Sequence, residues 1–400
     1  MPPPSLIKQS LWLPVLAAAL GYSVDLYDIV LFGVVRVASL KDLGLNGAEA
    51  TLWAIRLLNL QMLGMLLGGF FWGWIGDTRG RRTALFASIA LYSAANLGNA
   101  FVTDVQGYAA MRLLAGIGLA GELGAGIALI SELLPARQRG YAVSIVACLG
   151  LLGALTAAVS GSQLPWRQAY LLGGGLGAAV LLLRFIAQHE SPLYLALAPG
   201  TLRSIRGIVA SADVTQRFGR VFLLGVPIWV ISALFVNLAP EFGRALGFAT
   251  PIKVGEVLLW QASGSALGTV GFGLLSEFVR SRKKAFALAL LLLAALTPLL
   301  LTRGSAAGWC AVMGAIGFVQ GYWTIFVIVC AEQFATGLRA TTATAIPNLV
   351  RGITIPATLG VQALAGSAGW PMAGAAFTGV AALAAAWALW GLPETWRQPL

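Results

Sequence analysis

Long apolar stretches alternate with short polar segments along almost the whole chain. Most of these stretches approach or exceed the roughly 20 residues that a helix needs to cross a membrane. They cover residues 11–37, 51–74, 83–101, 105–130, 141–161, 169–187, 220–240, 253–276, 285–301, 306–331, 340–365 and 370–392. Charged residues gather in the short segments between them, as polar loops between membrane helices require. The pattern predicts an all-α membrane protein with twelve transmembrane helices.

The composition supports this class, because charge is too sparse to cover a water-facing surface. Only 10% of the 400 residues are charged and 58% are hydrophobic, whereas soluble domains are about one quarter charged. The cysteines Cys148, Cys310 and Cys330 lie in apolar stretches, and His189 is the single histidine. We therefore expect no disulfide, metal or cofactor. No phosphate-binding loop and no nucleophile–base set is present, which argues against ATP-driven transport and against an enzyme.

The net charge of +11 raises the question of a nucleic-acid partner, but the positions of the basic residues argue against one. Most of the 26 lysines and arginines fall in segments that the predicted helices place on one side of the membrane. Such a bias marks the cytoplasmic side. We therefore expect both termini to be cytoplasmic, lipid to surround the helices, and the location to be a bacterial inner membrane.

One polar turn between two apolar stretches carries an acid followed by three arginines. Residues 73–82 read Gly-Trp-Ile-Gly-Asp-Thr-Arg-Gly-Arg-Arg, and Gly80 supplies the backbone freedom that a short reversal needs. This turn resembles the loop between helices 2 and 3 of the major facilitator superfamily, with Thr78 in place of the usual basic residue. The resemblance implies a secondary transporter.

A second copy of this pattern lies in the other half of the chain. Residues 273–284 again place an acid, Glu277, after a glycine and before several basic residues, although no glycine matches Gly80. Many transporters are built from such repeats, with a binding site between two bundles. We predict two pseudo-symmetric six-helix bundles: an N-terminal one at 1–187 and a C-terminal one at 220–400, joined by a cytoplasmic linker at 188–219.

Five further segments resemble other signatures of the superfamily. Residues 112–121 are similar to its helix 4 motif, and their glycines are expected to permit close helix packing. The G-x-G-x-x-G at 116–121 follows no strand, which excludes a dinucleotide site. Four segments, 132–140, 189–195, 332–340 and 392–395, resemble the sugar-porter and metabolite:proton symporter branches, with His189, Leu193 and Ala335 as departures from the pattern.

Acids in these motifs lie at the predicted inner ends of helices, near loop arginines. Such pairs would hold the cytoplasmic side closed in one state and separate in the other, and the alternative for each is a solvated interface charge. The predicted gating residues are Gly73, Asp77, Arg81, Arg82, Glu132, Arg139, Glu190, Glu277, Arg280, Glu332 and Arg339.

Four charged residues inside the predicted helices are candidates for proton coupling. Asp25 and Asp28 share one face of the first helix, and two carboxylates at membrane depth do not both stay ionised without a cation nearby. By resemblance to the sugar-porter branch, we expect Arg112 and a proton to compete for Asp28. The alternative is a permanent ion pair that holds two helices together. Glu122 is either a second proton carrier or the partner of another helix.

Two pairs of polar residues, in opposite halves, are candidates for substrate binding. Arg56 shares a face of the second predicted helix with Asn59, and Asn348 shares a helix face with Arg351. Arg351 lies between Pro347 and Pro356, where we expect irregular backbone. Arginines that meet at a central cavity would suit a carboxylate through bidentate hydrogen bonds. The alternatives are that Arg56 extends to the outer surface and that Arg351 pairs with a carbonyl or an acid.

Further polar and aromatic residues are predicted to line the same cavity, with ordinary packing as the alternative. They are Tyr27, Trp229, Asn237, Gln261, Gln320, Tyr322 and Trp323. The sequence thus predicts an alternating-access, proton-coupled symporter of a small polar metabolite, an organic anion such as a carboxylate. A sugar or polyol symporter is the first alternative, followed by a drug:proton antiporter and a non-transporting nutrient sensor. The monomer is the expected functional unit.

Overall fold

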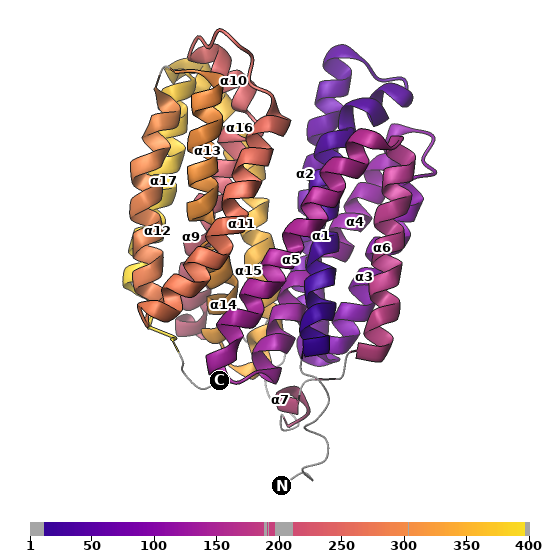
Figure 1. Cartoon of the computed structure of the whole chain (residues 1–400), viewed down its shortest axis with the longest axis vertical. Coiled ribbons are helices and arrows are strands. Elements are labelled where there is room, and N and C mark those ends of the chain that lie inside the picture. Colours follow the sequence, from indigo (N-terminus) through magenta and orange to yellow (C-terminus); the bar gives the residue numbers. More distant parts are fainter. Residues whose placement is uncertain (1–11, 188–189, 191, 197–210, 303, 397–400) are drawn as a thin grey trace.

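The computed structural model describes residues 12–187, 190, 192–196, 211–302 and 304–396, and within them the fold is helical with no strand. Two bundles stand side by side (Figure 1). The first contains α1 (Trp12–Asp42), α2 (Gly47–Thr78), α3 (Arg81–Asn99), α4 (Val105–Leu133), α5 (Ala136–Gln163) and α6 (Trp166–Ala187). The short helix α7 (Pro192–Leu195) lies beneath this N-terminal half.

The C-terminal half contains six further long helices, several of them interrupted. They are α9 (Ala212–Phe235), α11 (Val254–Phe278), α12 (Arg282–Leu296) with η2 (Thr297–Leu301), α13 (Ala306–Gln320) with α14 (Trp323–Glu332), α15 (Thr336–Gly352) with α16 (Thr354–Ala368), and α17 (Trp370–Trp390). The short helix α10 (Ala239–Ala245) lies at the end opposite to α7. The helix α9 begins before the predicted start at 220, and most of the predicted linker lies outside the described residues.

The described chain has ten helical segments that are long and apolar enough to cross a membrane. The helices α3 and α5 complete the predicted set of twelve. Large apolar side chains such as Ile186, Phe278 and Trp390 are exposed on the outside of the bundles, which is the arrangement that lipid requires. The prediction of a twelve-helix membrane protein is confirmed.

Two predicted helices are each divided into two α-helices, and the sequence explains one of the breaks. The α15–α16 junction lies at Ile353, and Pro356 follows within one turn. Proline has no N–H to continue the hydrogen-bond ladder, so the irregular backbone predicted near Pro347 and Pro356 is found there. The α13–α14 junction at Gly321 lies directly against the backbone of Gly268, a closeness that only a glycine allows.

Glycines let the helices of each bundle approach backbone to backbone, as predicted for 112–121. A Cβ on Gly118 would lie 2.5 Å from the Tyr92 nitrogen, and one on Gly121 would lie 2.6 Å from the Ser88 Cβ. Both distances are shorter than normal contacts, so α3 and α4 pack closely through these positions. The glycine motif is therefore a packing motif in this chain.

The same principle predicts a strong stability effect in the C-terminal half. A Cβ on Gly268 of α11 would overlap the carbonyl oxygen of Phe318, whereas a Cβ on Gly255 of the same helix meets nothing within 4 Å. We expect Gly268→Ala to destabilise the protein by about 1–3 kcal/mol or more, because the backbone contact has no room to adjust. Thermal unfolding in detergent measures this, with Gly255→Ala as the matched control. Equal melting temperatures for both variants would contradict this packing.

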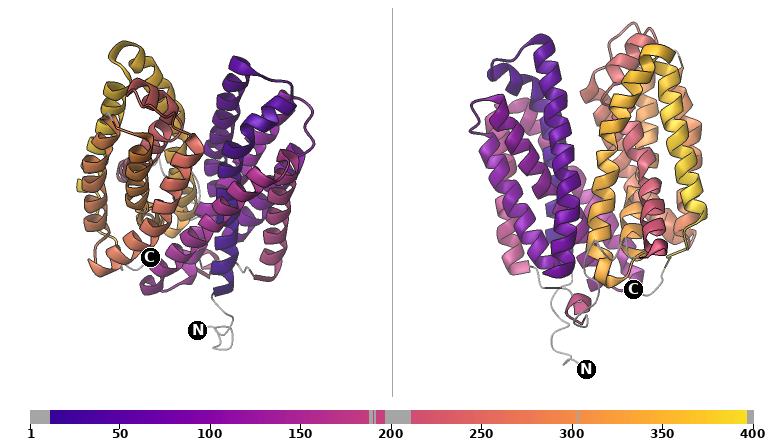
Figure 2. Two further views of the ribbon diagram at one scale, coloured as in Figure 1. Left: turned by 45° about the horizontal axis from the view of Figure 1, so that its top comes forward. Right: turned by 180° about the vertical axis from the view of Figure 1, so that it is seen from behind.

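The two halves are in contact at one end and lie apart at the other. The described residues nearest the two termini, the α2–α3 turn and the start of α15 all lie at the end where the ribbons converge (Figure 1). Figure 2 shows the same divergence toward the other end from two further directions. We call the end at which the halves are in contact, where α2, α3, α4 and α15 meet, the closed end.

Candidate functional site

A network of buried charges joins the halves at the closed end. Arg81 of α3 binds Glu132 of α4 through two hydrogen bonds of 2.9 and 3.1 Å. Its guanidinium also lies 3.1 Å from Asp77 and donates to the Thr336 carbonyl of α15. Arg339 of α15 reaches back to Glu132 at 3.1 Å. Two predicted gating residues of the N-terminal half, Arg81 and Glu132, are therefore bonded directly to the C-terminal half.

Backbone contacts strengthen this network. The carboxylate of Asp77 accepts hydrogen bonds from the backbone nitrogens of Ala340 and Thr341, at 3.1 and 2.8 Å. A Cβ on Gly73 would lie 2.6 Å from the Thr341 Cα, so α2 and α15 touch at a glycine. We call the set Gly73, Asp77, Arg81, Glu132 and Arg339 the closed-end latch.

Two further predicted gating residues of the N-terminal half, Glu190 and Arg82, lie beside this latch. Glu190 accepts hydrogen bonds from the backbone nitrogens of Arg81 and Arg82, at the start of α3, where a helix N-terminus favours an anion. The Arg82 side chain is exposed and lies over the Phe86 ring at 5.1 Å. It is therefore not part of the latch in this state. The side chain of Arg139 lies outside what the structure describes.

In the C-terminal half, Arg280 takes no part in the network of buried charges in this state. Arg280 adopts a left-handed backbone conformation, with φ of 52°, and its side chain is exposed. It occupies the turn position that Gly80 occupies in the first copy, where φ is 103°. Arg282 instead pairs with Glu277 at 2.9 Å and with Glu332 at 3.6 Å. An alignment of Glu277 with Asp77 places Arg280 opposite Gly80, and this signal could have identified the turn.

Glu394 lies in the segment 392–395, which resembles a superfamily signature, but it is not among the predicted site residues. Its carboxylate accepts hydrogen bonds from the Ser281 hydroxyl and from the backbone nitrogens of Arg282 and Lys283. Glu394 therefore caps the start of α12 as Glu190 caps the start of α3.

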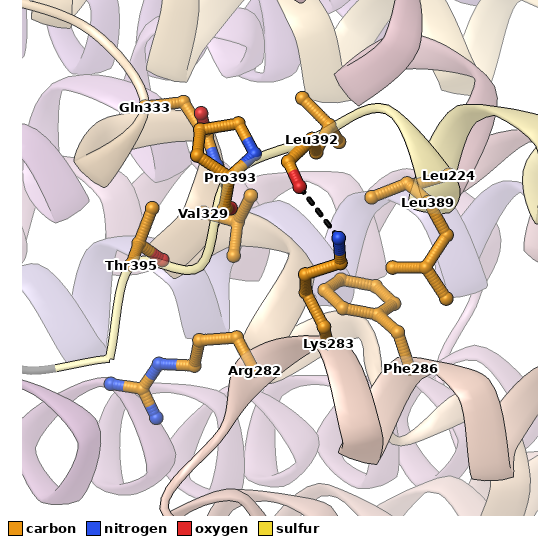
Figure 3. A pocket seen from close by; sticks show the side chains of 10 residues that line it. All are labelled: Leu224, Arg282, Lys283, Phe286, Val329, Gln333, Leu389, Leu392, Pro393 and Thr395. Carbon is orange, nitrogen blue, oxygen red and sulfur yellow. Dashed lines mark hydrogen bonds between the residues drawn. The ribbon is translucent and has the colours of Figure 1, made fainter.

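A hollow beside this cap is lined by Arg282, Lys283, Phe286 and residues from the ends of α14 and α17 (Figure 3). The Lys283 ammonium donates to the Leu392 carbonyl at 2.7 Å. Arg282 is paired with Glu277 and Glu332, so both basic side chains of this hollow already have partners within the protein.

The predicted pair of Asp28 and Arg112 is present inside the N-terminal half. The guanidinium of Arg112 donates to both oxygens of Asp28, at 2.9 and 3.1 Å, and both side chains are fully buried. The Gln61 amide donates to the same carboxylate at 2.6 Å. Phe32 and Tyr170 lie against the guanidinium, which suits a cation held in an apolar setting.

Glu122 has a partner that the sequence analysis did not single out. Arg184 of α6 donates to both of its carboxylate oxygens, at 2.5 and 2.9 Å. Ser88 of α3 donates to Glu122, and the Leu85 carbonyl accepts from Arg184. Of the two interpretations of Glu122, the pairing with another helix is what the structure shows. The only sequence signal was an arginine inside an apolar stretch.

The second ion pair between the halves lies deep within the bundle. Arg351 of α15 donates to both oxygens of Asp25 of α1, at 2.8 and 3.4 Å. Asp25 is fully buried, and Arg351 is 2% exposed. The guanidinium lies 5.7 Å from the Trp229 ring and 5.9 Å from the Trp323 ring. We call Asp25, Arg351, Trp229 and Trp323 the central site.

Two hydrogen-bond donors of the central site have no partner in the described structure. They are the Nε atom of Arg351 and the Nε1 atom of Trp229, both buried. Buried donors are nearly always satisfied, and each such exception calls for an explanation. The Nε atoms of Arg112 and Arg184 also have no partner among the described residues, so the Trp229 donor and the two aromatic faces beside the cation are what distinguish the central site.

Arg56 is not part of the central site. It is exposed at the surface of α2 and lies over the Trp53 ring at 5.1 Å, so it does not meet Arg351. A long cationic side chain extends toward water when its helix position permits it, which was the stated alternative. Asn348, by contrast, is buried and donates to the Ala120 carbonyl of the other half at 3.0 Å.

Most of the other predicted lining residues are bonded within one half. Tyr27 donates to the Ala169 carbonyl in the N-terminal half. In the C-terminal half, Gln261 donates to Gln320 at 2.6 Å, and Tyr322 donates to the Leu224 carbonyl. Asn237 is exposed beyond the end of α9. In this state the structure brings only Trp229 and Trp323 of this set to Arg351.

The glycines of α4 provide a test of the contact between the halves. A Cβ on Gly124 would overlap Thr344 of α15, whereas one on Gly126 would lie 3.5 Å from the Ala18 Cβ, an ordinary contact. We expect Gly124→Ala to disfavour the closed end by roughly tenfold, since overpacking costs about 1–3 kcal/mol. The measurement is the rate at which a thiol reagent labels a cysteine at Thr341, in a background without native cysteines.

The matched control for this experiment is Gly126→Ala, which is expected to leave the labelling rate unchanged. Thr341 is buried against Gly73 at the closed end, so its labelling reports separation of the halves. A Gly124→Ala variant that labels as slowly as the control would contradict the proposed tight contact between α4 and α15.

The chain has extensive similarity to known proteins. The profile of the Major Facilitator Superfamily matches residues 15–358. The 3-(3-hydroxy-phenyl)propionate transporter of Escherichia coli is 28% identical over 315 residues, which cover 73% of each protein. The niacin transporter NiaP of Acinetobacter baylyi is 33% identical over 159 residues, which cover 39% of this chain and only 35% of that transporter.

The similarity extends to three-dimensional structure. The proton:xylose symporter XylE superposes with a TM-score of 0.71 at 19% sequence identity, over 98% of this chain and 97% of the symporter. At this identity the match shows a shared fold. It assigns neither substrate nor coupling ion.

Proposed function

Because the chain belongs to the Major Facilitator Superfamily, we propose that it is a proton-coupled symporter of an aromatic carboxylate. The superfamily and the similar transporters support a membrane transporter of a small organic anion rather than an enzyme. The aromatic class is suggested by the relatives, whose names refer to niacin and to hydroxyphenylpropionate.

One observation carries the anion preference: Arg351 is buried between the halves with two tryptophans beside it. A guanidinium binds a carboxylate through two parallel hydrogen bonds, and tryptophan faces attract planar rings. The unpartnered donors on Arg351 and Trp229 supply further hydrogen bonds. The sugar alternative lacks comparable support, because Gln261 and Gln320 bind each other and are not presented to a ligand.

The proton would be held by the buried acids of the N-terminal half. Asp28 is paired with Arg112, and Asp25 with Arg351. A buried carboxylate that loses its cation takes up a proton, since an unpaired charge at this depth is costly. Glu122 remains a candidate only if its pair with Arg184 separates during transport.

Alternating access would proceed by separation of the closed-end latch. In the described state, Arg81, Glu132 and Arg339 hold the halves together at that end. If the closed end faces the cytoplasm, as the basic residues favour, the state is open toward the outside. Breaking these bonds while the other end closes would deliver the substrate inward.

Uptake into proteoliposomes tests the proposed substrate class. Vesicles containing the purified protein are given radiolabelled benzoate with an inward proton gradient, and unlabelled nicotinate, 4-hydroxybenzoate or xylose is added as competitor. We expect protein-dependent benzoate uptake that nicotinate or 4-hydroxybenzoate reduces and xylose does not. Uptake of xylose in place of benzoate would favour the sugar symporter instead.

A further inference from the structure

At the central site, a carboxylate of the protein occupies the position that the proposed function gives to the substrate. Both terminal nitrogens of Arg351 bind Asp25, at 2.8 and 3.4 Å. A substrate carboxylate would use the same two nitrogens in the same bidentate geometry. Asp25 and the substrate cannot both make these bonds at once, so they compete for one cation.

We propose that Asp25 is an internal substitute for the substrate carboxylate, which the substrate displaces from Arg351 while Asp25 takes up one proton. This inference rests on the proposed function, because it requires that Arg351 binds the substrate. It adds a specific role for Asp25, distinct from that of Asp28, and it makes proton uptake a part of substrate binding.

The surroundings of Asp25 explain why its release requires a proton. The charged and titratable groups that face it are Arg351 from α15, Glu122 from α4, and Asp28 and Tyr22 from its own helix. Among these described neighbours only Arg351 is a cation. A buried carboxylate that loses its one cation is strongly destabilised, and protonation removes the charge.

The two other arginines near this part of the N-terminal half are not available as replacement partners. Arg112 is bound to both oxygens of Asp28, and Arg184 to both oxygens of Glu122. Transfer of either arginine to Asp25 would leave another buried carboxylate unpaired. Solvent protons are therefore the available source of neutralisation.

The exchange balances in charge and in atoms. Before binding, the site holds one guanidinium cation and the Asp25 anion. After binding it holds the guanidinium, the substrate anion and neutral Asp25, with the added proton taken from water. When the substrate leaves, Asp25 gives up this proton and pairs with Arg351 again. One proton thus accompanies each monocarboxylate with no change in the net charge of the site.

The exchange also acts on the contact between the halves. Asp25 belongs to α1 of the N-terminal half and Arg351 to α15 of the C-terminal half. Displacement of Asp25 therefore breaks a direct bond between the halves at the moment of loading. An ion pair that exists in only one state biases the equilibrium between states, so substrate binding and the transition become linked.

Proton uptake on binding tests this inference directly. The purified full-length chain in weakly buffered detergent solution is titrated with sodium benzoate, and separately with sodium nicotinate, while a pH indicator records protons and calorimetry records binding. Linkage predicts that wild type takes up about one proton per bound anion, and that affinity falls as pH rises.

Two variants sharpen the test. In Asp25→Asn the internal competitor is absent, so we expect almost no proton uptake and an affinity higher by about tenfold, because the binding-competent site no longer has to be vacated. Asp42→Asn is the matched control: it makes the same change on the same helix, at an exposed acid that pairs with Arg167. It should behave as wild type.

The outcomes separate this inference from the proposed function. Anion binding by wild type without proton uptake, or equal proton uptake by Asp25→Asn, would overturn the role of Asp25 and leave carboxylate transport in place. Failure of wild type and Asp25→Asn to bind either anion would overturn the proposed function and this inference together. The wild-type titration shows whether anion binding is accompanied by proton uptake, even if the Asp25→Asn protein does not fold.

Discussion

Replacement of Arg351 by glutamine is expected to lower the affinity for benzoate by at least about a hundredfold. Loss of one partner of a buried, hydrogen-bonded charge pair costs about 2–5 kcal/mol, and glutamine cannot neutralise a carboxylate. Trp229 and Trp323 remain in place but offer only their faces and one indole donor. Calorimetry in detergent measures the effect on wild-type and variant protein.

Arg56→Gln is the control for this experiment, because it makes the same change at an arginine that the structure places at the surface. Arg56 is exposed and contacts the Trp53 ring, so we expect benzoate affinity within about twofold of wild type, as for most surface substitutions. Undiminished binding by Arg351→Gln, or an equal loss in Arg56→Gln, would contradict the assignment of the central site.

The second large effect is expected at Asp28. In Asp28→Asn the guanidinium of Arg112 stays buried against Phe32 and Tyr170 without its anion. Removal of one partner of a buried ion pair costs about 3–5 kcal/mol, and Gln61 donates rather than accepts at this position. We expect lower thermal stability and a loss of at least about a hundredfold in benzoate uptake driven by a proton gradient.

The double variant Asp28→Asn/Arg112→Gln separates stability from coupling. It removes the unpaired cation, so thermal stability should recover most of the loss, because buried ion pairs are often replaceable by neutral groups. Uptake against a gradient should stay low if Asp28 carries a proton. Recovery of both stability and gradient-driven uptake would make the pair purely structural, which was the alternative interpretation.

The fold was largely predictable because membrane helices leave a strong pattern in sequence. Apolar stretches of spanning length, the turn at 73–82 and its repeat at 273–284 together indicated two bundles. The helix breaks at Gly321 and Ile353 were harder to predict. Proline marks the second, but the first depends on how closely Gly268 of another helix approaches, which is a tertiary property.

The site was only partly predictable, because the sequence does not show which residues form ion pairs with the buried charges. Resemblance paired Asp28 with Arg112 correctly. The partners of Glu122 and Asp25, by contrast, lie far away in the chain, on α6 and α15. Helix periodicity shows which residues share a face of one helix. It does not show which other helix packs against that face.

The positions of Arg56 and Arg280, away from the central site and the charge network in this state, have local causes. Both were selected because an arginine lay in a suggestive segment. Arg56 lies on a helix surface from which its side chain reaches water, and Arg280 takes the left-handed turn position of the repeat. Side-chain direction decides the case of Arg56 and backbone conformation that of Arg280, and residue type alone reveals neither.

We propose that a carboxylate and a proton move together through this protein. The most direct measurement is the internal pH of proteoliposomes after external benzoate is added, with the membrane potential clamped and protein-free vesicles subtracted. The account predicts protein-dependent acidification that is absent in Arg351→Gln vesicles. Benzoate entry without protein-dependent acidification, or equal acidification in the Arg351→Gln vesicles, would contradict it.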